Sequence, residues 1–161
     1  MRTVAFALAA VLLSAVPAIA ADQPCRLQNA AVERDIAQRA ARLHGNEYCE
    51  YRRYAVGDWD GDRLDDLAVT FNVEGANGSG NGISAYLLVY LSSRHEAAPL
   101  EAAVGRRGEF LPASIEAGIG RTITVKTVEW SPRDPMCCPS RHGSRVFRVL
   151  PSGLVDERGT R

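Results

Sequence analysis

A cluster of aspartates in the first half of the chain constrains its fold more than any other feature. Residues 57–69 read GDWDGDRLDDLAV, so five carboxylates fall within nine residues and an apolar run follows. Like charges at this density repel one another, and a folded loop tolerates them when a hard cation lies between them. We therefore expect a metal-binding turn that leads directly into a strand.

The spacing of these aspartates fits a cage of oxygen ligands. Counted from Asp58, Asp60 is third, Asp62 fifth, Leu64 seventh and Asp66 ninth. Alternate residues can turn toward a common centre, and the seventh can offer its backbone carbonyl. Ca²⁺ accepts six to eight oxygen ligands of these kinds, so the spacing favours calcium as the cofactor.

The same numbering excludes an EF-hand. That motif requires glycine at the sixth position and glutamate at the twelfth, where this chain has Arg63 and Val69. Gly61 relieves the tight bend of the turn. In this arrangement Trp59, Arg63 and Asp65 face outward, unless the Trp59 ring folds back over the hairpin.

Residues 58–67, DWDGDRLDDL, resemble the calcium loop of FG-GAP and VCBS-type repeats, known from integrin α-subunit propellers. In that family the loop is a β-hairpin turn that holds Ca²⁺. The resemblance implies side-chain ligands Asp58, Asp60, Asp62 and Asp66, with Leu64 as the carbonyl ligand. A propeller needs many copies, whereas this chain has one. The chain is thus more similar to small exported bacterial proteins that carry a single loop after an N-terminal helix, a resemblance that implies no activity.

One amphipathic helix is predicted before the aspartate cluster. Its apolar stripe recurs at helical spacing and comprises Val32, Ile36, Ala40 and Leu43. Asn29 can cap the first turn, and Gly45 fits the C′ position after the last turn. We expect this helix to cover one face of a sheet.

The remainder of the chain consists of short runs of strand-forming residues separated by turn residues. The expected strands are residues 50–56, 67–73, 83–91, 100–104, 110–117, 121–130 and 145–150, with a short return at 154–155. One helix followed by such strands predicts an α+β fold, in which the helix packs on an antiparallel meander of six or seven strands.

The first 20 residues are predicted to be a signal peptide. Arg2 supplies a positive n-region, residues 4–16 are apolar but too short to span a bilayer, and residues 18–20 read AIA, a cleavage signature. We expect cleavage after Ala20, a single domain over residues 21–161, and a periplasmic or secreted product.

The four cysteines are expected to form disulfides in that oxidising compartment. Three connectivities are possible for Cys25, Cys49, Cys137 and Cys138, and pairing Cys25 with Cys49 is slightly favoured. In that case the two adjacent cysteines form a vicinal disulfide or stay reduced. Residues 134–140 also resemble a cysteine-pair loop of some small exported proteins.

Charge and the remaining reactive residues narrow the function. The chain has 19 Lys and Arg against 19 Asp and Glu, which gives no reason to expect nucleic acid or anionic lipid as a partner. His44, His95 and His142 are scattered, and no catalytic constellation stands out. We expect a non-enzymatic binding or envelope-associated domain with an unknown protein partner. The alternatives are a metal-dependent hydrolase that uses the acidic turn, or a secreted inhibitor or partner-binding protein.

Overall fold

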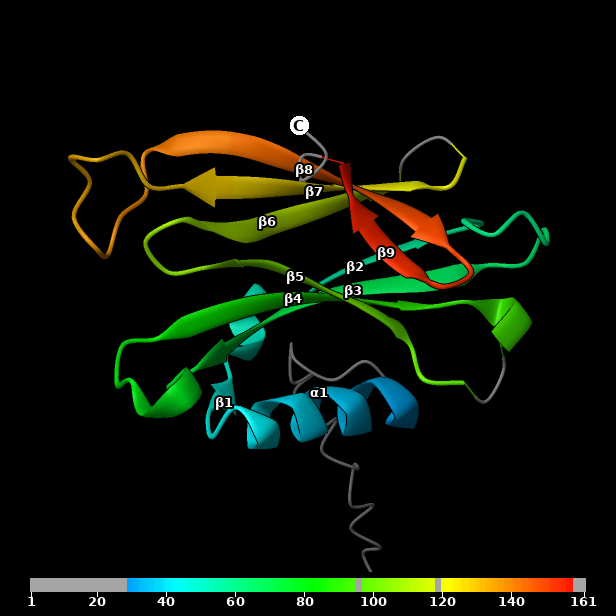
Figure 1. Ribbon diagram of the computed structural model, residues 1–161, viewed down its shortest axis with the longest axis horizontal. Helices are drawn as coiled ribbons and strands as arrows, with labels where there is room; N and C mark the ends of the chain where they lie inside the picture. Colours follow the sequence, from blue (N-terminus) through cyan, green and yellow to red (C-terminus); the bar gives the residue numbers. More distant parts are fainter. Residues whose placement is uncertain (1–28, 95–96, 118–119, 158–161) are drawn as a thin grey trace, which may run out of the picture.

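The computed structural model describes residues 29–94, 97–117 and 120–157, so the predicted signal peptide and Cys25 lie outside the described residues. Among the residues that it describes, no helix is both long and apolar enough to cross a membrane. Its elements (Figure 1) are α1 (Ala30–Arg42), β1 (Asn46–Glu47), η1 (Cys49–Tyr51), β2 (Arg53–Gly57), β3 (Asp66–Glu74), η2 (Ala76–Gly78), β4 (Ile83–Tyr90), η3 (Ser92–Arg94), β5 (Leu100–Arg106), β6 (Phe110–Ala117), β7 (Thr122–Glu129), β8 (Arg141–Leu150) and β9 (Gly153–Asp156).

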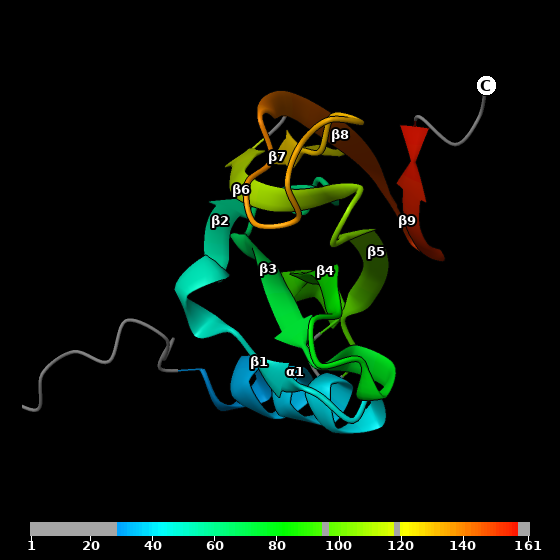
Figure 2. The same ribbon diagram turned by 90° about the vertical axis from the view of Figure 1, so that its left-hand side faces the viewer.

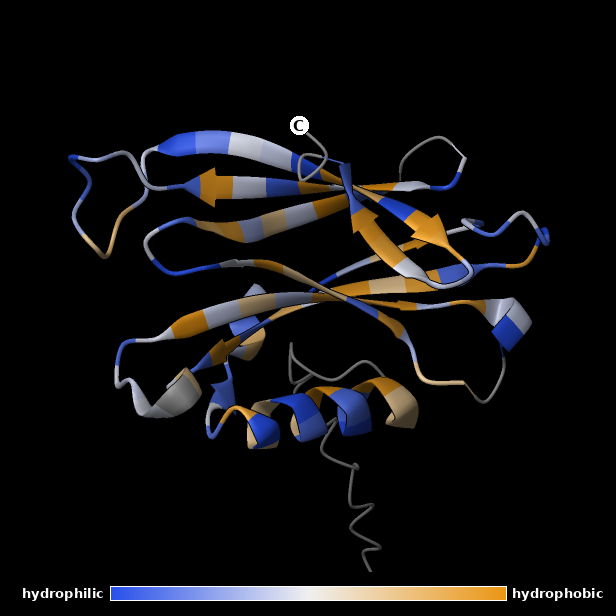
Figure 3. Cartoon of the chain, viewed as in Figure 1, coloured by the Kyte–Doolittle hydropathy of each residue, from blue (hydrophilic) through white to orange (hydrophobic). Residues whose placement is uncertain are grey.

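Helix α1 forms where the sequence predicts it. The Asn29 side chain accepts hydrogen bonds from the backbone N–H groups of Ala31 (3.1 Å) and Val32 (3.3 Å). These bonds satisfy donors that the first turn of a helix leaves without partners. The apolar stripe of α1 faces the sheet (Figure 3) and packs against buried residues of β3 and β4.

The end of α1 differs from the prediction in one respect. The residue in the left-handed conformation is His44, with φ 53°, and not Gly45. Gly45 is required by space instead, because a Cβ at this position would collide with the backbone oxygen of Glu74. The missing side chain of Gly45 therefore lets the chain turn closely under β3.

Within the described residues nine strands form one antiparallel sheet, so the predicted helix on a meander is confirmed, but the predicted count of six or seven strands is too low. From β2 to β9 each strand pairs with the next in the chain. The prediction missed β1, which pairs with β3 through only two residues, and counted β9 as a short return. The expected strand at 50–56 begins only at Arg53, because Cys49–Tyr51 forms a 3₁₀ turn.

The sheet folds over between β5 and β6 and forms two layers, with α1 outside the lower one (Figure 2). β5 and β6 pair at a single position, Arg106 with Phe110. The layers also meet where Arg53 of β2 donates from Nε to the backbone oxygen of Ala113 in β6 (3.0 Å). The main core fills the space between them with Trp59, Ala68, Ala85, Leu87, Val89, Leu91, Leu100, Val104, Leu111, Ile123, Val125, Phe147 and Val149.

A buried arginine joins α1 to β1 and β2. The guanidinium of Arg52 donates to both carboxylate oxygens of Glu47 (2.7 and 2.5 Å) and of Glu33 (2.5 and 3.2 Å), and to the Tyr54 hydroxyl (3.1 Å). Burial opposes the charge, but the hydrogen bonds to Glu47, Glu33 and Tyr54 outweigh it and hold the pKa of Arg52 above its usual value. The charged group is thus fully partnered inside the fold.

The cysteines behave partly as expected. Cys137 and Cys138 form a vicinal disulfide in the loop between β7 and β8. Cys49 is also disulfide-bonded, and its partner is not among the described residues, so the favoured pairing with Cys25 stays a prediction. Asp134 organises the same loop by accepting from the backbone N–H groups of Ser131 (2.7 Å) and Ser140 (2.8 Å).

Candidate metal centre

The acidic turn joins β2 to β3 at one end of the molecule (Figure 1). The two strands pair in register down to Gly57 and Asp66, so residues 58–65 form the hairpin connection itself. The turn η3 follows β4 at the same end, because β4 runs antiparallel to β3 with Tyr90 opposite Leu67. The sheet therefore brings two connections far apart in sequence side by side.

The aspartates themselves shape the turn. Asp58 accepts from the backbone N–H groups of Gly61 (2.7 Å) and Arg63 (3.0 Å), and Asp62 accepts from that of Leu64 (2.7 Å). Short carboxylate side chains reach backbone donors a few residues ahead in this way, which is why aspartate is common in turns. Gly61 has φ 85°, a value that glycine adopts at little cost, as the sequence predicts.

Three of the predicted ligands converge. Carboxylate oxygens of Asp58, Asp60 and Asp66 lie within 4.8 Å of one another, close enough to hold a metal ion. Asp66 is only 1% exposed, and no salt bridge neutralises any of the three carboxylates among the residues that the structure describes. All the donors are hard oxygens, which fit Ca²⁺ or Mg²⁺ rather than a metal that prefers nitrogen or sulfur.

The other two predicted ligands lie outside this group of three carboxylates. The Asp62 carboxylate accepts from the Ser92 hydroxyl (2.9 Å) instead. Leu64 is exposed at the tip of the turn, with 54% of its surface accessible. Their predicted roles, one as a side-chain ligand and one as a carbonyl ligand, stay predictions.

Trp59 is buried, so of the two orientations expected for it the outward one is wrong and the folded-back one is confirmed. Its side chain is 1% exposed and belongs to the main core, and its backbone N–H donates to Asp66 Oδ2 (2.8 Å). The ring folds back between the two layers and packs in the main core. It thus gives the otherwise polar turn an apolar contact with the rest of the fold. Arg63 and Asp65 are exposed, as predicted.

Two serines after β4 hold the acidic turn, a role that the sequence does not predict. Ser92 donates from its backbone N–H to Asp66 (2.8 Å) and shares its one hydroxyl hydrogen between Asp62 (2.9 Å) and Asp66 (3.2 Å). Ser93 donates from its hydroxyl to Asp60. The signal that could have found them is the strand register: if β3 and β4 form a hairpin, the residues after Tyr90 must lie beside Asp66.

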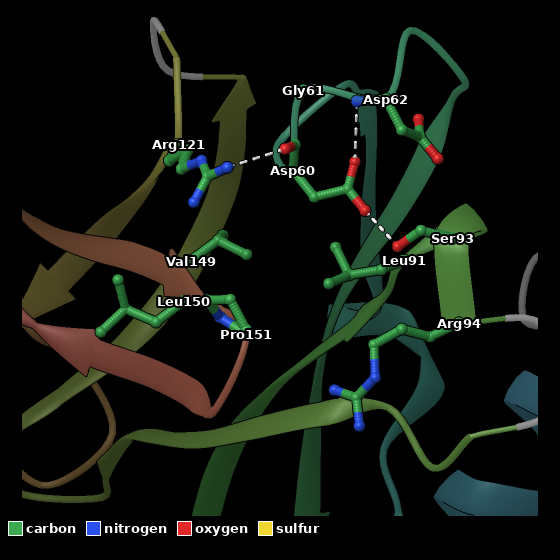
Figure 4. A pocket seen from close by; sticks show the side chains of 10 residues that line it. All are labelled: Asp60, Gly61, Asp62, Leu91, Ser93, Arg94, Arg121, Val149, Leu150 and Pro151. Carbon is green, nitrogen blue, oxygen red and sulfur yellow. Dashed lines mark hydrogen bonds between the residues drawn. The ribbon is translucent and has the colours of Figure 1, made fainter.

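A cavity of about 440 Å³ opens beside the turn (Figure 4). Arg121, just before β7, donates from Nη2 to the backbone oxygen of Asp60 (3.0 Å) at its rim. The apolar part of the lining comprises Leu91, Val149, Leu150 and Pro151. The described lining contains neither histidine nor cysteine.

Comparisons with protein-family models, with curated proteins and with solved structures found no match to this chain. The resemblance to FG-GAP and VCBS-type loops therefore stays a prediction from the sequence of the turn. The candidate site rests on its own geometry, in which a buried carboxylate and two neighbouring ones converge at the start of β3.

Proposed function

We propose that this chain is an exported, non-enzymatic binding or envelope-associated domain whose acidic turn holds one structural Ca²⁺ ion. The observation that carries the proposal is the convergence of Asp58, Asp60 and Asp66, none of which forms a salt bridge among the described residues. A bound dication supplies the missing positive charge. Asp62 and the Leu64 carbonyl are the further ligands that the FG-GAP resemblance implies.

The choice of calcium follows from the kind of turn. Mg²⁺ demands near-ideal octahedral geometry and keeps several waters, whereas Ca²⁺ accepts more oxygen ligands in a flexible arrangement. A hairpin turn with several carboxylates and an available backbone carbonyl suits the larger ion. Since the ligands come together only in the folded chain, binding energy adds to folding stability.

A structural role is better supported than hydrolysis. A metal-dependent hydrolase needs an open coordination position and a group that takes up a proton. The described lining of the adjoining cavity contains the guanidinium groups of Arg94 and Arg121, which are hydrogen-bond donors only, and the carboxylates of Asp60 and Asp62, which already accept hydrogen bonds within the turn. The hydrogen bonds that Asp60 and Asp66 accept hold these carboxylates within the turn.

Calorimetric titration of the metal-depleted protein with Ca²⁺ tests this proposal. We expect one site per chain, lost in Asp60→Asn and kept in Asp65→Asn, which removes the same charge from an exposed position of the same turn. If Asp65→Asn weakens binding as much as Asp60→Asn, the ion is attracted only by the net charge of the turn, and the proposed site is wrong.

A further inference from the structure

The cavity beside the acidic turn has the dimensions of a small-molecule site. Its volume of about 440 Å³ lies in the usual range for ligand pockets, which are mostly apolar with a few polar groups. Among the described residues, four connections far apart in sequence line it: the acidic turn, η3, the chain before β7 and the β8–β9 turn (Figure 4). Strand β8 of one layer and connections of the other layer therefore contribute to one pocket.

Arg94, at the end of η3, carries a buried donor without a partner. Its Nη1 atom is inaccessible to solvent and makes no hydrogen bond, and within the described chain the side chain forms no salt bridge. A buried polar group that is left unpaired destabilises the fold, and a charged one does so more strongly. Arg94 is also a lining residue of the cavity, so an anion bound there would lie beside this guanidinium.

Arg121 provides a second guanidinium on the other side of the cavity (Figure 4). It donates from Nη2 to the backbone oxygen of Asp60, and no carboxylate among the described residues pairs with it. A guanidinium has five N–H donors in a planar fork that matches carboxylate and phosphate oxygens. The two arginines therefore form a pair of anion-binding groups.

The acidic residues of the lining do not reverse this preference. Asp60 accepts from the Ser93 hydroxyl and from the backbone N–H of Asp62, and Asp62 accepts from Ser92 and from the N–H of Leu64. These carboxylates are engaged within the turn, whereas the guanidinium of Arg94 is not engaged. Among the described lining residues, the side-chain group without a hydrogen-bond partner is thus a cation, the guanidinium of Arg94.

We propose that this cavity binds a small amphipathic oxyanion, with a carboxylate or phosphate head between Arg94 and Arg121. The short apolar tail lies on the apolar wall formed by Leu91, Val149, Leu150 and Pro151. This proposal rests on the binding role proposed above and names small amphipathic oxyanions as the class of ligand. Its readout is separate from that of the calcium site, because the arginines and the apolar wall belong to other elements than the aspartates of the turn.

Calorimetric titration of the purified protein with octyl phosphate, octanoate and octylamine tests the proposal. We expect one site for an octyl anion and none for octylamine. Binding should weaken about tenfold or more in Arg94→Gln and in Arg121→Gln, since each removes a charge-assisted hydrogen bond. Arg133→Gln, in an exposed loop at the other end of the molecule, is the matched control and should bind as the unchanged protein does.

Comparison of the two anions separates a phosphate from a carboxylate head group. Circular dichroism of each variant establishes that it is folded, and Arg94→Lys gives a second variant that keeps the charge but loses the fork. Absence of binding by both anions, equal binding of octylamine, or equal weakening in Arg133→Gln would overturn the proposal. The anion titration is repeated with Ca²⁺ and with a chelator. Failure of the anion proposal is seen as absent anion binding under both conditions, whereas failure of the calcium site is seen as absent Ca²⁺ binding.

Discussion

Asp66 links the acidic turn to the core more closely than any other predicted ligand. Its two oxygens accept from the backbone N–H groups of Trp59 and Ser92, each at 2.8 Å, and the side chain is buried. In Asp66→Asn an amide N–H₂ group must face one of these donors. We expect a loss of about 2 kcal/mol in the free energy of unfolding, measured by urea denaturation with a chelator present.

The control for Asp66 is its neighbour. Asp65 is exposed, so Asp65→Asn should change the free energy of unfolding by less than about 0.5 kcal/mol. Equal losses in the two variants would mean that the hydrogen bonds of Asp66 contribute nothing specific.

Arg52 offers a second test at the residue scale. Its side chain is 2% exposed and bridges Glu33 and Glu47, so Arg52→Met leaves two carboxylates without their cation. Breaking a buried ion pair from one side costs about 3 kcal/mol or more, which thermal or urea denaturation detects. Arg34→Met, which removes an exposed partner of Asp35, should cost less than about 1 kcal/mol; a comparable loss there would contradict the assigned role of burial.

Single residues of the site were predictable in type but not in all their contacts. The spacing of the aspartates is a local pattern, so Asp58, Asp60 and Asp66 could be named from the sequence. The direction of the Trp59 ring could not, because it depends on the space between two layers that the local sequence does not specify. The contact of Ser92 with Asp66 could not be predicted locally either, because it follows from the register of two strands that are paired in the fold.

At the scale of elements, the loop between β7 and β8 is the clearest case of pH dependence. Hydrogen bonds from the Ser131 and Ser140 backbones and the Ser140 hydroxyl hold the pKa of Asp134 below its usual 3.8. A depressed carboxyl pKa stabilises the folded loop above about pH 4, and this contribution is lost as pH falls through the lower folded value. The loop is therefore expected to loosen as the pH falls below about 4.

Amide hydrogen exchange at Ser140 measures this effect, because its N–H donates to Asp134. We expect slow exchange, corrected for the intrinsic rate, down to about pH 4 and faster exchange below it. Asp134→Asn should remove the pH step. A step that persists in this variant would assign it to another group.

Local signals explain which elements were predictable. Helix α1 has a cap, a stripe of apolar residues and a break within one short segment, so its sequence specifies it almost completely. β1 has two residues, too few for any periodicity, and it exists because Asn46 and Glu47 pair with the far end of β3. The left-handed His44 was missed because Gly45, the better residue for that conformation, is needed one position later for space.

At the scale of the whole molecule, the class of fold was predictable. The folding of the sheet into two layers was not. A helix and a run of strands with short connections predict a meander covered on one face. The folding of that meander into two layers depends on contacts between β2 and β6, which are distant in sequence. The cavity could not be predicted from the sequence either, because its lining residues are distant in sequence and meet only when the two layers form.

The folding of the sheet into two layers also brings the candidate calcium site and the proposed anion cavity together at one end of the molecule. The acidic turn, η3 and the β8–β9 turn all lie there (Figure 1). Asp60 belongs both to the cluster of carboxylates and to the cavity lining, so an ion at the cluster would lie beside any bound anion. Opposite charges at this distance attract, and each ligand is expected to strengthen binding of the other by the same factor.

The dependence of thermal stability on Ca²⁺ tests the metal site most directly. At a Ca²⁺ concentration about 100 times the Kd, binding adds about 2.7 kcal/mol to the free energy of unfolding, a rise of about 5–10 °C in Tm for a chain of this size. We predict this rise for the unchanged protein and for Asp65→Asn, and its loss in Asp60→Asn or in excess chelator. Identical melting curves of the unchanged protein with Ca²⁺ and with chelator would contradict the proposed calcium site.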